Sequence, residues 1–160
     1  PRVLAKAADD TGGAVSVVGW SLGGIFAREL ARNHPELVRQ VVTLVSPFAM
    51  TGASRSHADR AFRRQSARHA GALTAREHLS RPVPVPSTAV FSRTDGIVAW
   101  RDCIQPVTAI HENVEVRSGH LGAGVDAAVM WLLADRLSLP EGAWRPFRAP
   151  TLLRPLFPGA

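Results

Sequence analysis

The sequence predicts an α/β fold, with a mostly parallel β-sheet flanked by helices. Short apolar segments alternate along the chain with amphipathic segments, which is the pattern of repeated strand–helix–strand units. The apolar segments are rich in valine and lack polar alternation, as expected for strands covered on both faces. The chain has 160 residues, of which 46% are hydrophobic, so it can bury the core of one domain.

The elements of the first half follow in chain order. An opening helix ends at the glycine pair at residues 12–13, because glycine readily closes a helix C-terminus. A first strand is predicted at residues 14–19 and a helix at residues 22–34. Pro35 ends this helix, since proline disfavours the α conformation of the residue before it. A second strand covers residues 38–46.

The second half begins with an insertion and closes the sheet. Residues 48–86 are too many for a simple crossover loop, and their arginine-rich composition favours short solvated helices. We expect a small helical cap there, which is either a plain crossover or a lid that shapes a substrate pocket. A third strand at residues 87–92, a short fourth strand at residues 113–116 and a helix at residues 125–137 follow. The proline-rich tail at residues 140–160 is expected to be extended, with its aromatic side chains docked on the domain.

Composition narrows the class of protein. The formal charge of +6 and the pI of about 11.3 would fit a nucleic-acid partner. However, Lys6 is the only lysine and no basic run is interleaved with aromatic residues, so no nucleic-acid partner is expected. Cys103 is the only cysteine, which excludes an intramolecular disulfide and a thiolate metal cluster. No segment approaches the roughly 20 apolar residues of a transmembrane helix.

The start of the chain also carries an expectation. It opens at Pro1 rather than at methionine, within what reads as the last turns of a helix. We therefore expect the sequence to be a piece of a longer protein. No signal peptide is recognisable, so a cytoplasmic location is the default expectation.

Residues 19–23, Gly-Trp-Ser-Leu-Gly, lie between the first predicted strand and the helix that follows it. A Gly-X-Ser-X-Gly motif in this context is typical of a nucleophile elbow, in which the serine occupies a strained turn above the sheet. The absence of side chains at Gly19 and Gly23 would let strand and helix pass close together. Ser21 is therefore the candidate nucleophile. The backbone N–H of Leu22, at the helix start, is the donor we assign to an oxyanion hole.

A serine nucleophile needs a base and a carboxylate that orients the base. In the nucleophile-elbow arrangement these follow in the order serine, acid, histidine, each in a loop after a strand. Asp95 lies in the loop after the third strand, within an Asp-Gly turn, and His120 lies in a small-residue loop after the fourth strand. Asp102 and Asp126 compete less well, because the first is farther from a strand end and the second is near a helix start. The other histidines fit less well by position; they are His34, His57, His69, His78 and His111.

In these three motifs the chain resembles the α/β-hydrolase superfamily, and in particular the C-terminal half of a bacterial esterase or lipase. The resemblance rests on residues 18–24 around the serine, 92–100 around the aspartate and 118–122 around the histidine, within a match that covers roughly residues 14–137. It implies an α/β-hydrolase-like sheet that lacks the N-terminal strands, in a partial domain at residues 1–139 followed by the tail at residues 140–160. The family's second oxyanion donor comes from a loop before the elbow, so Leu22 is the only donor assigned here. The free edge of the first strand would then offer a surface for self-association.

The predicted function is hydrolysis of acyl esters by a serine hydrolase. Ser21 attacks the ester carbonyl, His120 serves as general base and then general acid, and Asp95 orients His120 and stabilises its charged form. Trp20 and Leu22 flank the nucleophile and are candidates to line an apolar acyl pocket, although Leu22 fits the core equally well. Neither a metal nor an organic cofactor is implied. Two alternatives stay open: acyl transfer to an alcohol or thiol by the same residues, and a non-catalytic lipid- or partner-binding role.

Overall fold

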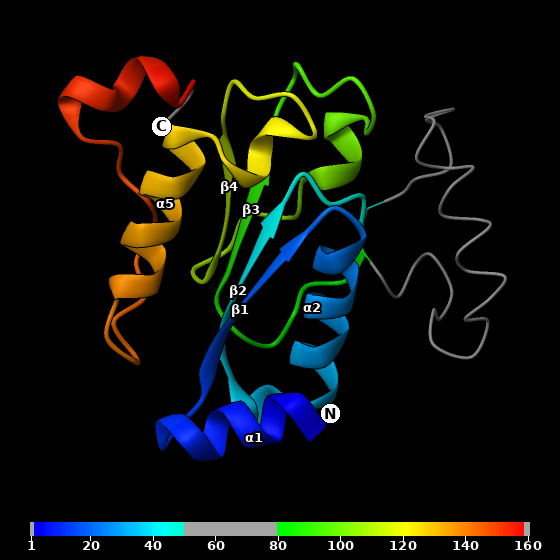
Figure 1. Cartoon of the computed structure of the whole chain (residues 1–160), viewed down its shortest axis with the longest axis vertical. Coiled ribbons are helices and arrows are strands. Elements are labelled where there is room, and N and C mark those ends of the chain that lie inside the picture. Colours follow the sequence, from blue (N-terminus) through cyan, green and yellow to red (C-terminus); the bar gives the residue numbers. More distant parts are fainter. Residues whose placement is uncertain (1, 50–79, 159–160) are drawn as a thin grey trace, which may run out of the picture.

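A computed structural model describes residues 2–49 and 80–158 of the chain (Figure 1). Four parallel strands form one sheet in this part of the chain, and their order in space follows their order in sequence. The strands are β1 (Val15–Trp20), β2 (Val38–Leu44), β3 (Ser87–Phe91) and β4 (His111–Glu115). The α/β prediction is therefore confirmed. The fourth strand begins two residues earlier than the apolar pattern indicated, because His111 and Glu112 are buried polar residues.

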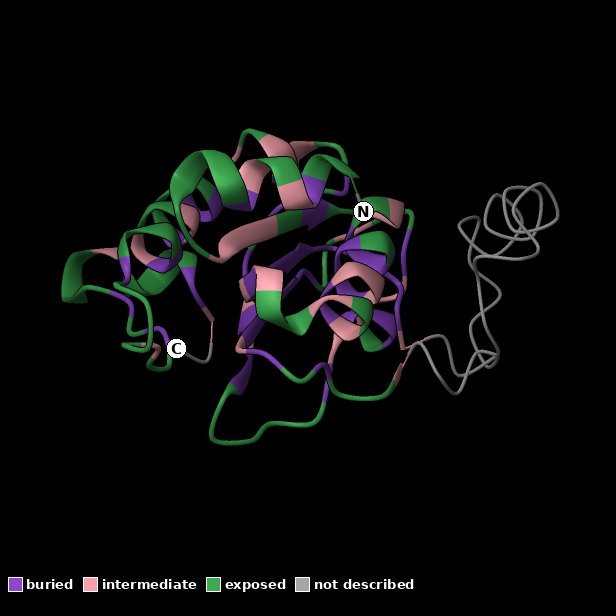
Figure 2. Ribbon diagram, turned by 90° about the horizontal axis from the view of Figure 1, so that it is seen from below, coloured by how far each residue is buried: buried purple, intermediate pink, exposed green. Residues whose placement is uncertain are grey.

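Helices cover both faces of the sheet (Figure 1). The described helices are α1 (Arg2–Thr11), α2 (Leu22–Asn33) and α5 (Ala127–Ser138). Successive strand residues point to opposite faces, so Val41 of β2 packs in the cluster with α2 while the next residue, Val42, packs in the cluster with α5. This accounts for the unbroken apolar run of β2, in which six of seven residues are buried. Figure 2 shows the buried residues concentrated in the sheet, with exposed residues on the outer faces of the helices.

The last helix starts later than its apolar pattern predicted. The carboxylate of Asp126 accepts hydrogen bonds from the backbone N–H groups of Ala128 (2.9 Å) and Val129 (3.3 Å) and so caps the helix. Val125 consequently lies outside α5 and is 81% exposed, rather than on its buried face. Asp126 is thus a helix-capping residue, which agrees with its placement at a helix start.

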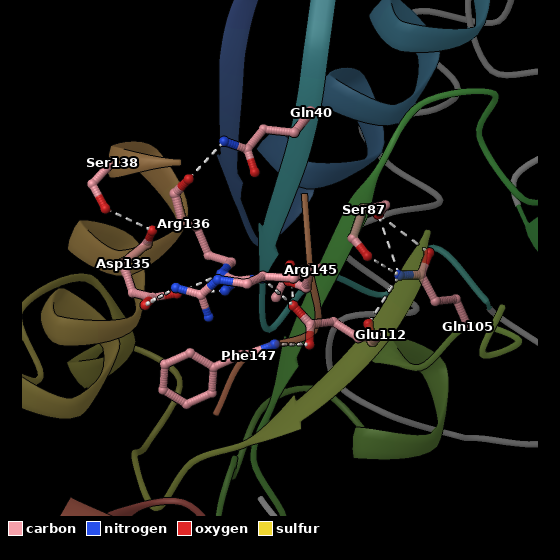
Figure 3. Close-up of polar contacts among 10 residues, drawn as sticks. Gln40, Ser87, Gln105, Glu112, Asp135, Arg136, Ser138, Arg145 and Phe147 are labelled. Carbon is pink, nitrogen blue, oxygen red and sulfur yellow. Dashed lines mark hydrogen bonds and ion pairs between the residues drawn. The ribbon is translucent and has the colours of Figure 1, made fainter. Parts of the chain in front are cut away.

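The C-terminal segment contributes to the core. Phe147 and Phe157 are buried in the same cluster as Val114 of β4 and Leu132 of α5, with their ring centroids 4.9 Å apart. Next to Phe147, Glu112 and Arg136 form a buried ion pair with a 3.0 Å separation (Figure 3).

Glu112 holds several elements together. Besides Arg136, its carboxylate accepts hydrogen bonds from the Thr88 hydroxyl of β3 (2.7 Å) and from the backbone N–H of Phe147 (2.6 Å). Arg136 also contacts the carboxylate of Asp135 on the same helix (Figure 3). One buried carboxylate therefore joins β3, β4, α5 and the C-terminal segment, and the sequence pattern did not indicate it.

Several expectations concern residues outside the described ranges. Most of the predicted cap at residues 48–86 falls there, as do His57, His69 and His78. The division at residues 139 and 140 stays a prediction. Among the helices of residues 2–49 and 80–158, none has the length and apolar character to cross a membrane.

Candidate active site

Ser21 occupies the turn between β1 and α2 with a backbone conformation that is rare for serine. Its φ and ψ angles are 52° and −122°, in a region where the side chain crowds the backbone. The turn is held by hydrogen bonds from the Ser21 N–H to the Leu44 carbonyl (2.8 Å) and from the Gly24 N–H to the Ser21 carbonyl (3.1 Å). A strained strand–turn–helix geometry of this kind is what a nucleophile elbow requires, and the elbow itself stays a prediction.

Two glycines let the strand and the helix approach each other: Gly19, as the motif indicated, and Gly24 rather than Gly23. A Cβ on Gly19 would overlap the backbone of Gly23 and Gly24. A Cβ on Gly24 would lie 2.5 Å from the hydroxyl oxygen of Ser46, which follows β2. A Cβ on Gly23 would meet nothing within 4 Å, so assigning the close approach to the missing side chain of Gly23 was wrong. The constraint at that position comes from its carbonyl group, which faces Gly19.

The structure brings Ser21, His120 and Asp95 together in one hydrogen-bonded series. The Ser21 hydroxyl lies 3.0 Å from Nε2 of His120, and Nδ1 of His120 lies 2.7 Å from Oδ2 of Asp95. The side chains of His120 and Asp95 are 7% and 1% exposed. The three residues follow β1, β4 and β3, so they meet at the edge of the sheet formed by the strand C-termini, where open α/β sheets place their sites.

Asp95 both shapes its turn and orients the histidine. Its Oδ1 atom accepts hydrogen bonds from the backbone N–H groups of Ile97 and Val98, each at 2.8 Å. Its other oxygen is thereby directed to His120. With Asp95 accepting from Nδ1, Nε2 of a neutral imidazole is left to accept the Ser21 proton.

The competing residues have other contacts. The backbone carbonyl of Asp102, in the 3₁₀ helix Trp100–Cys103, accepts from the N–H of Ala49 at 2.8 Å. His111 bonds the Thr108 hydroxyl and the Val83 carbonyl, each at 2.9 Å, and His34 lies 3.8 Å from Glu36. Among the described histidines, His120 is the one that hydrogen-bonds Ser21.

A second set of contacts joins the aspartate loop to the histidine loop. The Thr94 hydroxyl donates to the Ser118 carbonyl at 3.3 Å, and the Ser118 N–H donates to the Ser92 hydroxyl at 3.3 Å. These residues flank Asp95 and His120 in sequence, so the contacts help to set the spacing between acid and base. Sequence reasoning missed them, although small hydroxyl residues on both sides of the two loops were a usable signal.

Trp20 and Leu22, the two neighbours of Ser21, differ in their surroundings. The Trp20 indole N–H donates to the backbone carbonyl of His120 at 3.2 Å, and the side chain is 42% exposed. Leu22 is partly buried and packs against the cluster of Ile25, Phe48 and Ala89, which favours a core role for its side chain. Its backbone N–H stands at the first residue of α2, and its oxyanion role stays a prediction. In the described part of the chain, no group of three His, Cys, Asp or Glu residues could hold a metal ion.

Comparison with known proteins agrees with this architecture. The model of the Alpha/beta hydrolase family matches residues 2–158. An alpha/beta hydrolase enzyme from the sediment metagenome of the Mar Chica lagoon, Morocco, is 17% identical with a TM-score of 0.53, covering 84% of this chain and 68% of that one. A monoacylglycerol lipase of Paleococcus ferrophilus is 11% identical with a TM-score of 0.54, covering 85% of this chain and 71% of that one.

A serine hydrolase involved in carbazole degradation is 22% identical with a TM-score of 0.50, covering 78% of this chain and 62% of that one. No curated protein matches the sequence. At these identities the solved structures bear on the fold alone, whereas the family model spans nearly the whole chain. The chain therefore belongs to the alpha/beta hydrolase family.

Proposed function

We propose that this protein is a serine hydrolase that cleaves carboxylic esters of acyl or lipid-like substrates through an acyl-enzyme. The observation that carries the proposal is the hydrogen-bonded series from Ser21 through His120 to Asp95, with separations of 3.0 and 2.7 Å. Membership of the alpha/beta hydrolase family supports it. The strained backbone of Ser21 also supports it, because such strain concentrates at functional sites.

In the proposed mechanism, the Ser21 oxygen forms a bond to the ester carbonyl carbon while its proton passes to Nε2 of His120. Asp95 holds the Nδ1–H of the imidazole and stabilises the imidazolium that results. When the tetrahedral intermediate collapses, the bond to the alcohol breaks and His120 returns the proton to the leaving oxygen. Water then repeats the sequence on the acyl-enzyme and releases the acid.

The developing oxyanion is assigned to the N-terminus of α2. Leu22 is the residue after the nucleophile, and its backbone N–H lies at the helix start, where the helix dipole favours negative charge. The partly exposed face of Trp20 is the proposed contact for the acyl chain.

A fluorophosphonate probe tests the proposal. Such a probe phosphonylates only an activated serine, so we expect one adduct, at Ser21, mapped by mass spectrometry. Ser21→Ala and His120→Gln should each lower the labelling rate by at least about a thousandfold. Ser138→Ala is the matched control, because Ser138 lies at the end of α5 and its hydroxyl donates to the Asp135 carbonyl; it should label like the unchanged protein.

Ester turnover completes the test. p-Nitrophenyl esters of increasing chain length should be hydrolysed by every variant that labels, and added alcohol should reveal any acyl transfer as a new ester. A folded sample that unfolds cooperatively but takes no label would refute the proposal and favour a binding role instead.

A further inference from the structure

The loop that carries His120 is rich in residues with little conformational preference. Gly119, Gly122 and Gly124 surround the histidine, and a glycine-rich segment loses more conformational freedom on ordering than any other. The short 3₁₀ turn Gly122–Gly124 and a hydrogen bond from the Ala123 N–H to the Gly119 carbonyl (3.1 Å) give it local order, and the contacts of Ser118 with the aspartate loop hold its start. A histidine in such a loop needs contacts from outside the loop to stay aligned with the serine.

Trp20 supplies such contacts from the elbow itself. Its indole N–H donates to the His120 carbonyl at 3.2 Å, and its ring centroid lies 6.3 Å from that of His120. The six-membered part of the indole also faces Gly124, where an added Cβ would lie 3.6 Å from the ring carbon Cζ3. Trp20 therefore lies against the histidine loop at two positions, His120 and Gly124.

The two segments are consequently joined at two points. Ser21 reaches the imidazole of His120 through its hydroxyl, at 3.0 Å, and the preceding residue reaches the backbone of the same histidine through an indole N–H. The imidazole itself is hydrogen-bonded to Ser21 and Asp95, whereas the bond from Trp20 restrains the backbone that carries the imidazole. Trp20 is also only partly buried, with 42% of its surface exposed, so its free face remains open to solvent.

We propose that Trp20 is a positioning residue, which holds the backbone of His120 so that Nε2 stays within hydrogen-bonding distance of Ser21. The inference rests on the proposed hydrolase function, and it goes beyond the expectation that Trp20 lines the acyl pocket. The two roles differ in what they change. A pocket wall alters the affinity for the reagent, whereas a positioning residue alters the rate of the chemical step once the reagent is bound.

The experiment compares the labelling kinetics of three proteins with the fluorophosphonate probe: the unchanged protein, Trp20→Phe and Trp131→Phe. Phenylalanine keeps an aromatic ring but removes the N–H donor. Trp131 lies on α5, is 49% exposed and serves as the control. We expect Trp20→Phe to lower the maximal labelling rate about tenfold, from the loss of one hydrogen bond, with the half-saturating probe concentration unchanged. Trp131→Phe should match the unchanged protein.

A second replacement and a second readout separate positioning from folding. Benzothienylalanine at position 20 keeps the shape of indole and lacks only the N–H, so it should reproduce the rate loss with an unchanged unfolding midpoint. The ¹H NMR resonance of the His120 Nδ1 proton should shift or broaden in both variants, because the imidazole is less well held against Asp95.

The results that overturn the inference are specific. An unchanged maximal rate, or an effect confined to the half-saturating concentration, would make Trp20 a pocket wall and nothing more. If the unchanged protein takes no label, the proposed function fails. The Nδ1 resonance then still decides on positioning, since an identical signal in the Trp20 variants would refute it.

Discussion

Two glutamates on β4 each pair with an arginine, and they differ chiefly in burial. Glu112 pairs with Arg136, whose side chain is fully buried, at 3.0 Å. Glu115 pairs with Arg93 at 3.1 Å, and the Arg93 side chain is 54% exposed. Replacing each glutamate by glutamine keeps shape and removes charge, so the two variants isolate the effect of burial on one strand.

We expect Glu112→Gln to lower the free energy of unfolding by about 3 kcal/mol. Breaking a buried ion pair costs about 3–5 kcal/mol, because the remaining charge is left in a medium that solvates it poorly. The lower end applies here, since Asp135 still contacts Arg136. The amide must also place an N–H₂ group where the carboxylate accepts from the Phe147 N–H (Figure 3) and from the Thr88 hydroxyl. Glu115→Gln should cost about 0.5 kcal/mol, as exposed pairs do.

Urea denaturation, followed by tryptophan fluorescence and circular dichroism, measures the difference. With a slope of about 2 kcal/mol per molar urea, Glu112→Gln should lower the midpoint by about 1.5 M and Glu115→Gln by about 0.25 M. Equal midpoints for the two variants would refute the reasoning, since burial would then carry no penalty for the unpaired arginine. If Glu112→Gln loses stability while the fluorescence of Trp144 stays unchanged, the ion pair stabilises the fold but does not link it to the C-terminal segment, which contains Trp144.

Three further predictions follow from the site. Gly19→Ala and Gly24→Ala should unfold the elbow or abolish fluorophosphonate labelling, because their methyl groups would overlap neighbouring atoms, whereas Gly23→Ala, which meets open space, should retain labelling and the unfolding midpoint. Thr94→Val should slow labelling about fivefold, because it removes the hydrogen bond to the histidine loop but keeps the side-chain volume; an unchanged rate would show that this contact does not align the site. Burial, followed by nearby carboxylates, raises the pKa of the Cys103 thiol, so the thiol should resist a disulfide reagent until the protein unfolds. The unfolded thiol loses its proton above about pH 9 while the folded one keeps it, so stability should fall as the pH rises above about 8. The slope should reach about 1.4 kcal/mol per pH unit above about pH 10, and Cys103→Ala should remove that part of it.

Much of the architecture was predictable because its signals are local. The valine-rich runs identified β1, β2 and β3 to within two residues at each end, and proline or glycine marked where the helices stop. The loops that follow β1, β3 and β4 carry Ser21, Asp95 and His120, respectively. Since the C-termini of parallel strands share one edge of the sheet, their order in the sequence was enough to predict that these side chains meet.

Other features depend on which residues meet across the fold, and no local pattern encodes that. The motif pointed to Gly23, but the helix passes closest to Ser46, in the loop after β2, at Gly24, one residue later. The pocket role of Trp20, which follows from its place beside the nucleophile, stays a prediction, whereas its hydrogen bond to the His120 carbonyl depends on the path of a loop one hundred residues away.

The sequence alone thus determined the fold class, the succession of strands along the chain and the three residues that converge at one edge of the sheet, because hydrophobic periodicity and turn chemistry act between near neighbours. Tertiary structure alone decided which residues distant in the sequence join the strands to the last helix and the C-terminal segment. Glu112 and Arg136 are 24 residues apart and become an ion pair only because β4 and α5 bury them together. The same exclusion of water strengthens their attraction and makes either charge costly without the other, so their partnership belongs to the packed fold and not to any segment of the chain.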